Sequence, residues 1–114
     1  MIKVFGGNQL RPNLHIHDYC EVVLRLIKAP SKKIRNQIFN VGNQNMSINN
    51  IDKLVKNTIE KKYKTKINIF RTKSNDNRSY HINSDKIYNI LKLRPKKNIK
   101  DAILEICDGF EKKK

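Results

Sequence analysis

The chain has 114 residues, a formal net charge of +15 at pH 7 and 38% hydrophobic residues. This length allows one domain with its own core, but it is short for a complete enzyme that binds two substrates. The chain has no apolar run of about 18 residues and no leader of the secretory type, so we expect no membrane anchor and a cytoplasmic location.

The positive charge raises nucleic acid as a partner. Of the 25 cationic residues, 19 are Lys, and they are spread over the chain rather than gathered into an arginine-rich stripe with aromatic residues between. The chain also holds 15 Asn and 16 Ile, so its composition is biased throughout. The charge pattern therefore favours a solvated surface, and a small basic nucleic-acid-binding module remains the alternative function.

The first predicted element is a short strand, IKVF, at residues 2 to 5. Gly6 and Gly7 follow it, and the absence of a Cβ atom lets the backbone turn sharply and approach a ligand. Gln9 and Arg11 come next, and at a spacing of two they project from one face of an extended chain. An amide beside a forked cation predicts a contact with phosphate.

A helix is predicted from Asp18, as its N-cap, to about Lys28, with Pro30 shortly after its end. Its apolar face comprises Tyr19, Val22, Val23, Leu26 and Ile27. Residues 37 to 42, QIFNVG, then predict a buried strand that requires cover on both faces.

Ser47 predicts the N-cap of the next helix. The residues that repeat at the helical period are Ile48, Ile51, Leu54, Val55, Thr58 and Ile59. A third strand, INIF, is predicted at residues 67 to 70.

A polar loop, TKSNDNR, occupies residues 72 to 78. Asp76 and Arg78 lie two positions apart in it, with Lys73 nearby, and together they offer an acceptor and a bidentate donor. The loop predicts a binding site. The alternative interpretation is a solvated surface ion pair that contributes little.

The rest of the chain predicts two helices. Ser84 caps a short one, and Pro95 separates it from a terminal helix. The apolar residues of the two helices are Ile87, Tyr88 and Leu91, then Ile99, Ala102, Ile103, Ile106, Cys107 and Phe110. Residues 111 to 114 predict a frayed basic tail. Alternating strands and helices indicate an α/β fold with three or four short strands and about four helices.

Three further patterns, which involve histidines, cysteines and a tyrosine–lysine pair, are interpreted as structural and not as functional sites. His15, His17 and Asp18 resemble part of a metal site, but the only other histidine is His81, so we expect no metal. Cys20 and Cys107 lack metal-ligand spacing and predict buried, reduced thiols.

Tyr88 and Lys92 match the Tyr-x-x-x-Lys pattern of proton abstraction. No Gly-rich strand-to-helix turn precedes them, so we interpret Tyr88 as a core residue.

Several modest motifs occur together in one order: VFGGNQLRP, HIHD, an apolar helix, IFNVG, Ser47 at a helix start, DNRSYHINSDKI and LKLRP. Over residues 2 to 108 this order resembles the C-terminal part of extended short-chain dehydrogenase/reductases, specifically the NAD-dependent nucleotide-sugar epimerases and dehydratases. The resemblance implies the substrate-binding lobe of a Rossmann-type enzyme, over residues 1 to 110.

The resemblance also implies roles for single residues. Arg11 matches an arginine that contacts substrate phosphate, and Gln9 lies beside it. Asp76 matches an acidic residue near the base or ribose, and Lys73 stands where many members have arginine. Arg78 belongs to an Asn-Arg-Ser-Tyr run of one branch, and its role is less defined.

The family's Gly-rich phosphate loop and catalytic Tyr-x-x-x-Lys would lie before Met1. The resemblance therefore implies that NAD is carried by an N-terminal Rossmann domain on a missing or separate segment, that this chain binds no cofactor alone, and that it is inactive by itself.

Overall fold

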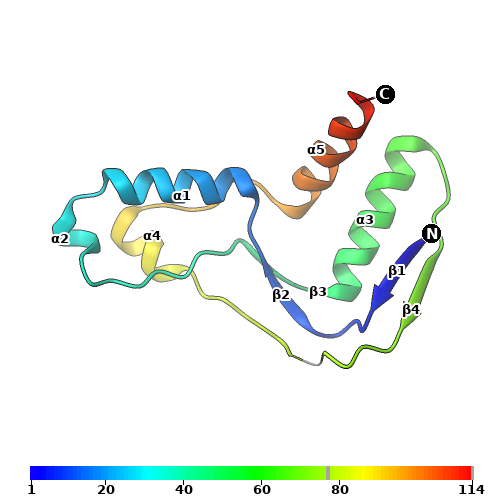
Figure 1. Cartoon of the computed structure of the whole chain (residues 1–114), viewed down its shortest axis with the longest axis horizontal. Helices are drawn as coiled ribbons and strands as arrows, with labels where there is room; N and C mark the ends of the chain where they lie inside the picture. Colours follow the sequence, from blue (N-terminus) through cyan, green and yellow to red (C-terminus); the bar gives the residue numbers. More distant parts are fainter. Residues whose placement is uncertain (77, 114) are drawn as a thin grey trace.

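The structure, a computed structural model, describes residues 1 to 76 and 78 to 113. Asn77, in the predicted loop, and Lys114, in the predicted tail, lie outside the described residues. The described part contains five helices and four strands (Figure 1): β1 (Ile2–Phe5), β2 (Leu10–Asn13), α1 (Ile16–Lys28), α2 (Ser31–Ile34), β3 (Gln44–Ser47), α3 (Ile48–Tyr63), β4 (Ile69–Thr72), α4 (Asp85–Leu91) and α5 (Ile99–Glu111).

The four strands form two separate pairs. β1 pairs with β4 in parallel, with Ile2 opposite Ile69, and β2 pairs with β3 antiparallel, with Leu10 opposite Ser47. The mixed α/β class and the first strand agree with the sequence. The third predicted strand forms two residues later than residues 67 to 70, at Ile69–Thr72.

The predicted strand at residues 37 to 42 is wrong, because this segment has no regular secondary structure and pairs with no strand in the described part of the chain. At the end of this segment, a side chain binds the backbone of Gly42 in place of a strand. The Ser84 hydroxyl accepts from the Gly42 N–H at 2.9 Å and donates to the Gly42 carbonyl at 3.1 Å. Ser84 therefore gives α4 no side-chain cap, contrary to the prediction. Phe39 and Val41 pack on the core, whereas Ile38 is 82% exposed.

The N-cap of α1 also differs from the prediction. His15 takes this position, and its Nδ1 accepts a hydrogen bond from the His17 N–H at 3.1 Å. Asp18 is buried in the first turn, where its carboxylate accepts from the backbone N–H groups of Lys96 and Lys97 at 3.0 and 2.8 Å. The carboxylate stabilises two donors of the segment before α5, which is why it cannot cap its own helix.

The starts of α3 and α5 agree with the sequence, whereas the short helix α2 was not predicted. The Ser47 hydroxyl accepts from the Asn50 N–H at 3.3 Å and caps α3. Asn98 and Asp101 form a reciprocal capping box at the start of α5, after Pro95.

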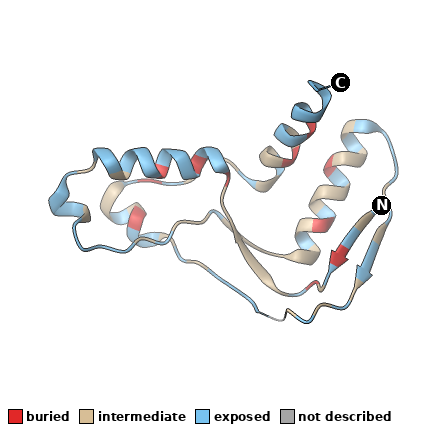
Figure 2. Cartoon of the chain, viewed as in Figure 1, coloured by how far each residue is buried: buried red, intermediate tan, exposed pale blue. Residues whose placement is uncertain are grey.

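The core consists of small clusters (Figure 2). One cluster joins α1, α4 and the segment after it through Val22, Ile87 and Leu93, with Leu26, Phe39, Val41 and Leu91 packed against it. Thr58 on α3 and Ile103 and Cys107 on α5 are buried in another part of the molecule. The buried position of Cys107 is confirmed, but Cys20 is exposed, so its predicted burial is wrong.

The molecule is flatter and more open than a typical domain of its length. Its radius of gyration is 17.1 Å, against about 13 Å for a compact domain of this length. Its accessible surface of 8792 Å² exceeds the roughly 6,500 Å² of a compact monomer of this mass. The chain therefore leaves apolar side chains in solvent that a compact fold would bury. In the described part of the chain, no helix has the length and apolar character to cross a membrane.

Candidate functional site

The turn after β1 is held by the side chain of Gln9. Its Oε1 accepts from the Gly7 N–H at 2.6 Å, and its Nε2 donates to the Phe5 carbonyl at 3.1 Å. Gly6 has a φ of 76°, and a Cβ atom at this position would collide with the Gln9 amide. In this conformation Gln9 fixes the turn that leads into β2.

Arg11 projects from β2 toward the segment that follows β4. Its Nη1 donates to the carbonyls of Leu10 and Arg78 at 2.9 and 2.5 Å. Its Nη2 donates to Asp76 Oδ2 at 3.3 Å. The guanidinium carbon lies 5.5 Å from the centroid of the Tyr80 ring, and the side chain is 27% exposed. The cation is therefore at the surface and already held in one direction.

Asp76 receives both arginines of this site. Arg78 binds it through two parallel contacts, Nε to Oδ1 at 2.7 Å and Nη2 to Oδ2 at 3.0 Å. These hydrogen bonds, and a further one from the Arg78 backbone, lower the pKa of Asp76 to about 2. The same contacts raise the pKa of Arg78 above its usual value. The carboxylate is thus ionised at neutral pH.

Backbone and side-chain hydrogen bonds bring these distant residues together. The Leu10 N–H donates to the Ser79 hydroxyl at 2.9 Å, and the Tyr80 N–H donates to the Leu10 carbonyl at 3.1 Å. Asn45 on β3 bonds both backbone groups of Ile82, at 2.9 and 3.0 Å. This segment runs from β4 back toward α4 (Figure 1) and so passes beside β2 and β3.

Of the five residues that the sequence singles out, the structure brings Arg11, Asp76 and Arg78 into one group. The Gln9 amide instead lies in the turn before β2, and Lys73 is exposed directly after β4. In this group two guanidinium groups surround the Asp76 carboxylate, which Arg78 contacts through both oxygen atoms and Arg11 through Oδ2.

Sequence reasoning missed a neighbouring hollow of about 400 Å³. It is lined by Gly6, Gly7, Asn8, Asn49, Lys53 and Arg71. Arg71 donates to Asp52 Oδ2 at 2.6 Å and to Asn49 Oδ1 at 3.2 Å. Arg71 directly follows the strand predicted at residues 67 to 70. Polar residues at the carboxyl ends of strands often form sites in parallel sheets, so this position could have indicated the hollow from the sequence.

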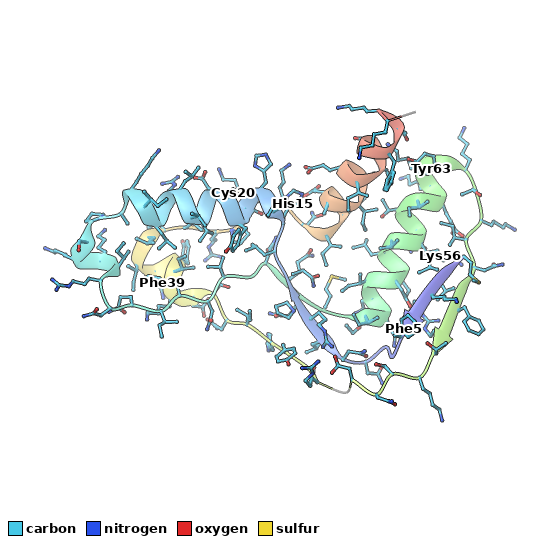
Figure 3. The ribbon with its side chains drawn as sticks, viewed as in Figure 1. Phe5, His15, Cys20, Phe39, Lys56 and Tyr63 are labelled. Carbon is cyan, nitrogen blue, oxygen red and sulfur yellow. The ribbon has the colours of Figure 1, made fainter. Side chains whose placement is uncertain are left out.

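The side chains of His15 and of the Tyr88–Lys92 pair, which the sequence also singled out, make contacts within the fold. Both ring nitrogens of His15 are engaged, since Nδ1 caps α1 and Nε2 lies 3.1 Å from Glu105 Oε2 on α5. Figure 3 shows His15 where the chain enters α1. The Arg94 guanidinium lies 3.6 Å from the centroid of the Tyr88 ring. Lys92 also lies over this ring, at 5.4 Å, so the lysine faces the π-system.

Comparison with known proteins places this fold. No protein-family model matches the sequence, and none of the curated proteins compared is similar enough to count as a relative. Solved structures do match. UDP-glucuronic acid 4-epimerase from Bacillus cereus, in complex with UDP-glucuronic acid and NAD, aligns over 89% of this chain and 32% of its own, with a TM-score of 0.72 and 20% identity.

Two further structures give the same result. Pal from Bacillus thuringiensis aligns over 99% of this chain and 35% of its own, with a TM-score of 0.77 and 23% identity. RMD from Pseudomonas aeruginosa, complexed with NADPH, aligns over 90% and 33%, with a TM-score of 0.69 and 16% identity.

The chain thus has the fold of one part of these proteins, and it spans about a third of the length of the structures it matches. The resemblance to extended short-chain dehydrogenase/reductases is confirmed at the level of the fold.

Proposed function

We propose that this chain forms the nucleotide-diphosphate-sugar-binding part of an NAD-dependent epimerase or dehydratase, and that Arg11 is its principal phosphate contact. The observation that carries the proposal is the meeting of Arg11 with Asp76, 65 residues later, at the surface beside a Gly-Gly turn. The fold match to an epimerase in complex with UDP-glucuronic acid and NAD supports the ligand class.

In this proposal the chain's contribution is binding. Arg11 supplies a planar fork for a phosphate group, Arg78 a second fork and Lys73 a point charge. The diphosphate would lie at the surface where β2 meets the segment after β4. The sugar would extend from it toward the reacting groups, which another part of the enzyme would provide.

The proposed partner is the NAD-binding Rossmann domain. Its support is the outer face of α1, where Ile16, Val23 and Ile27 are 69%, 39% and 75% exposed. With Cys20 these residues follow a spacing of four, three and four, so they form one stripe along the helix. An exposed apolar stripe along a helix is typical of a surface that contacts another protein. The two thiols are free, which is consistent with the proposed cytoplasmic location.

Calorimetric titration of the 114-residue chain with UDP tests the phosphate contact. The Arg11→Ala variant should bind UDP about tenfold more weakly or worse, because a charge-assisted hydrogen bond to phosphate is lost. Arg35→Ala is the matched control, because it removes the same charge from an exposed position after α2. Equal losses in the two variants would show that only overall charge matters and would overturn the assignment of Arg11.

A further inference from the structure

The two arginines of the candidate site share one carboxylate. Arg78 contacts both oxygen atoms of Asp76, and Arg11 contacts Oδ2 at 3.3 Å. Two planar cations around two oxygen atoms are the arrangement in which guanidinium groups bind a phosphate. Asp76 therefore has the position and the charge of a bound anion.

The remaining contacts of Arg11 keep it directed at this carboxylate. Its Nη1 is held by the carbonyls of Leu10 and Arg78, and the Tyr80 ring lies on one side of the guanidinium. The donor group is thus oriented before any ligand arrives, which lowers the entropic cost of binding. An incoming phosphate group would meet Arg11 where Asp76 now lies.

We propose that Asp76 is an internal competitor: it occupies the arginine pair that the diphosphate of the ligand would use, and ligand binding displaces it. This inference rests on the proposed function. It differs from the role that the family resemblance implies for Asp76, a favourable contact with the base or ribose. The two roles predict opposite effects when the charge of Asp76 is removed.

The exposure of the site makes such displacement feasible. The side chains of Asp76 and Arg78 are 38% and 72% exposed, so their ion pair is screened by water and is weak. A diphosphate carries more charge and more acceptor atoms than one carboxylate, so it can replace these contacts. Because the pKa of Asp76 is about 2, the carboxylate competes throughout the neutral range.

The test is calorimetric titration of the 114-residue chain with inorganic pyrophosphate and, separately, with UDP. In Asp76→Asn the affinity for pyrophosphate should rise about three- to tenfold, because a competing negative charge is gone. Asp85→Asn, at an exposed position on α4, makes the same change elsewhere and should leave the affinity near the wild-type value. In Arg11→Ala/Asp76→Asn the gain should disappear.

The outcomes separate this inference from the proposed function. An unchanged or weaker pyrophosphate affinity in Asp76→Asn overturns the competitor role. If Asp76→Asn also weakens UDP binding, and Arg11→Ala weakens it too, the proposed function stands and Asp76 contacts the nucleoside. If no variant binds either ligand, both fail. Asp76→Ala should repeat the result of Asp76→Asn, and circular dichroism confirms that each variant is folded.

Discussion

Two regions of this molecule are held together by different forces. Around α4, Ile87 is fully buried at 0% exposure, and apolar side chains from α1 and the chain after α4 surround it. Around Arg11, a hydrogen bond from the Leu10 N–H to the Ser79 hydroxyl and another from the Asn45 amide to the Ile82 carbonyl hold the segment that follows Asp76 against β2 and β3. Burial stabilises the first region strongly, whereas hydrogen bonds at a wet surface contribute less. Substitutions in the site should therefore change ligand binding more than stability.

The largest expected effect comes from the apolar region. Ile87→Ala should lower the free energy of unfolding by about 2 to 5 kcal/mol, because it leaves a cavity among packed side chains. Urea denaturation measures this change. Ile38→Ala, at an 82% exposed position, should change stability by less than about 0.5 kcal/mol. Similar losses in both variants would mean that Ile87 does not form the centre of a packed cluster.

In the polar region, Asn45→Ala should lower the free energy of unfolding by about 1 to 3 kcal/mol, because both backbone groups of Ile82 lose their hydrogen-bond partner. Faster amide hydrogen exchange at Ile82 should accompany the loss. Asn68→Ala, at an exposed position before β4, is the control and should leave that exchange rate unaltered.

A smaller effect is expected where the two regions join. His15→Ala should lower the free energy of unfolding by about 1 kcal/mol, because α1 loses the acceptor that caps its N-terminus. His15→Asn supplies a carboxamide oxygen in its place and should restore most of the difference in thermal unfolding. If His15→Asn is no more stable than His15→Ala, the ring acts through its contact with Glu105 and not as a cap.

The smallest expected effect is the pH dependence of the Asp76 contacts. The folded pKa is depressed to about 2, so these contacts add stability above the unfolded pKa of about 4 and lose it as the pH falls through 2. Urea midpoints for wild type and Asp76→Asn should differ at pH 5 and converge near pH 2. A constant difference across this range would contradict the assignment.

The sequence predicted the elements whose signals are local. Ser47 and the repeat of apolar residues after it specify α3, and IKVF before two glycines specifies β1. It failed for residues 37 to 42, because strand pairing depends on a neighbour that no local pattern reveals. It failed for Asp18 for the same reason, since the donors at Lys96 and Lys97 are distant in sequence.

The candidate site was predictable only in part. Spacing indicated Arg11 and, separately, the pair Asp76 and Arg78. That all three meet depends on hydrogen bonds between β2 and a segment about 70 residues later, such as the bond from Leu10 to Ser79. Similarly, the sequence predicts one apolar face for α1 that includes both Val22 and Ile27, but only the structure shows that Val22 is buried in the core and that Ile27 is exposed.

The exposed thiol of Cys20 gives the chain a natural reporter group. It lies on α1 (Figure 3), within the apolar stripe of this helix, whereas the Cys107 thiol is buried on α5. A maleimide should label one sulfur rapidly and the other only after unfolding. Protection of Cys20 upon mixing with a candidate subunit would then map the contact on the native chain without an engineered label.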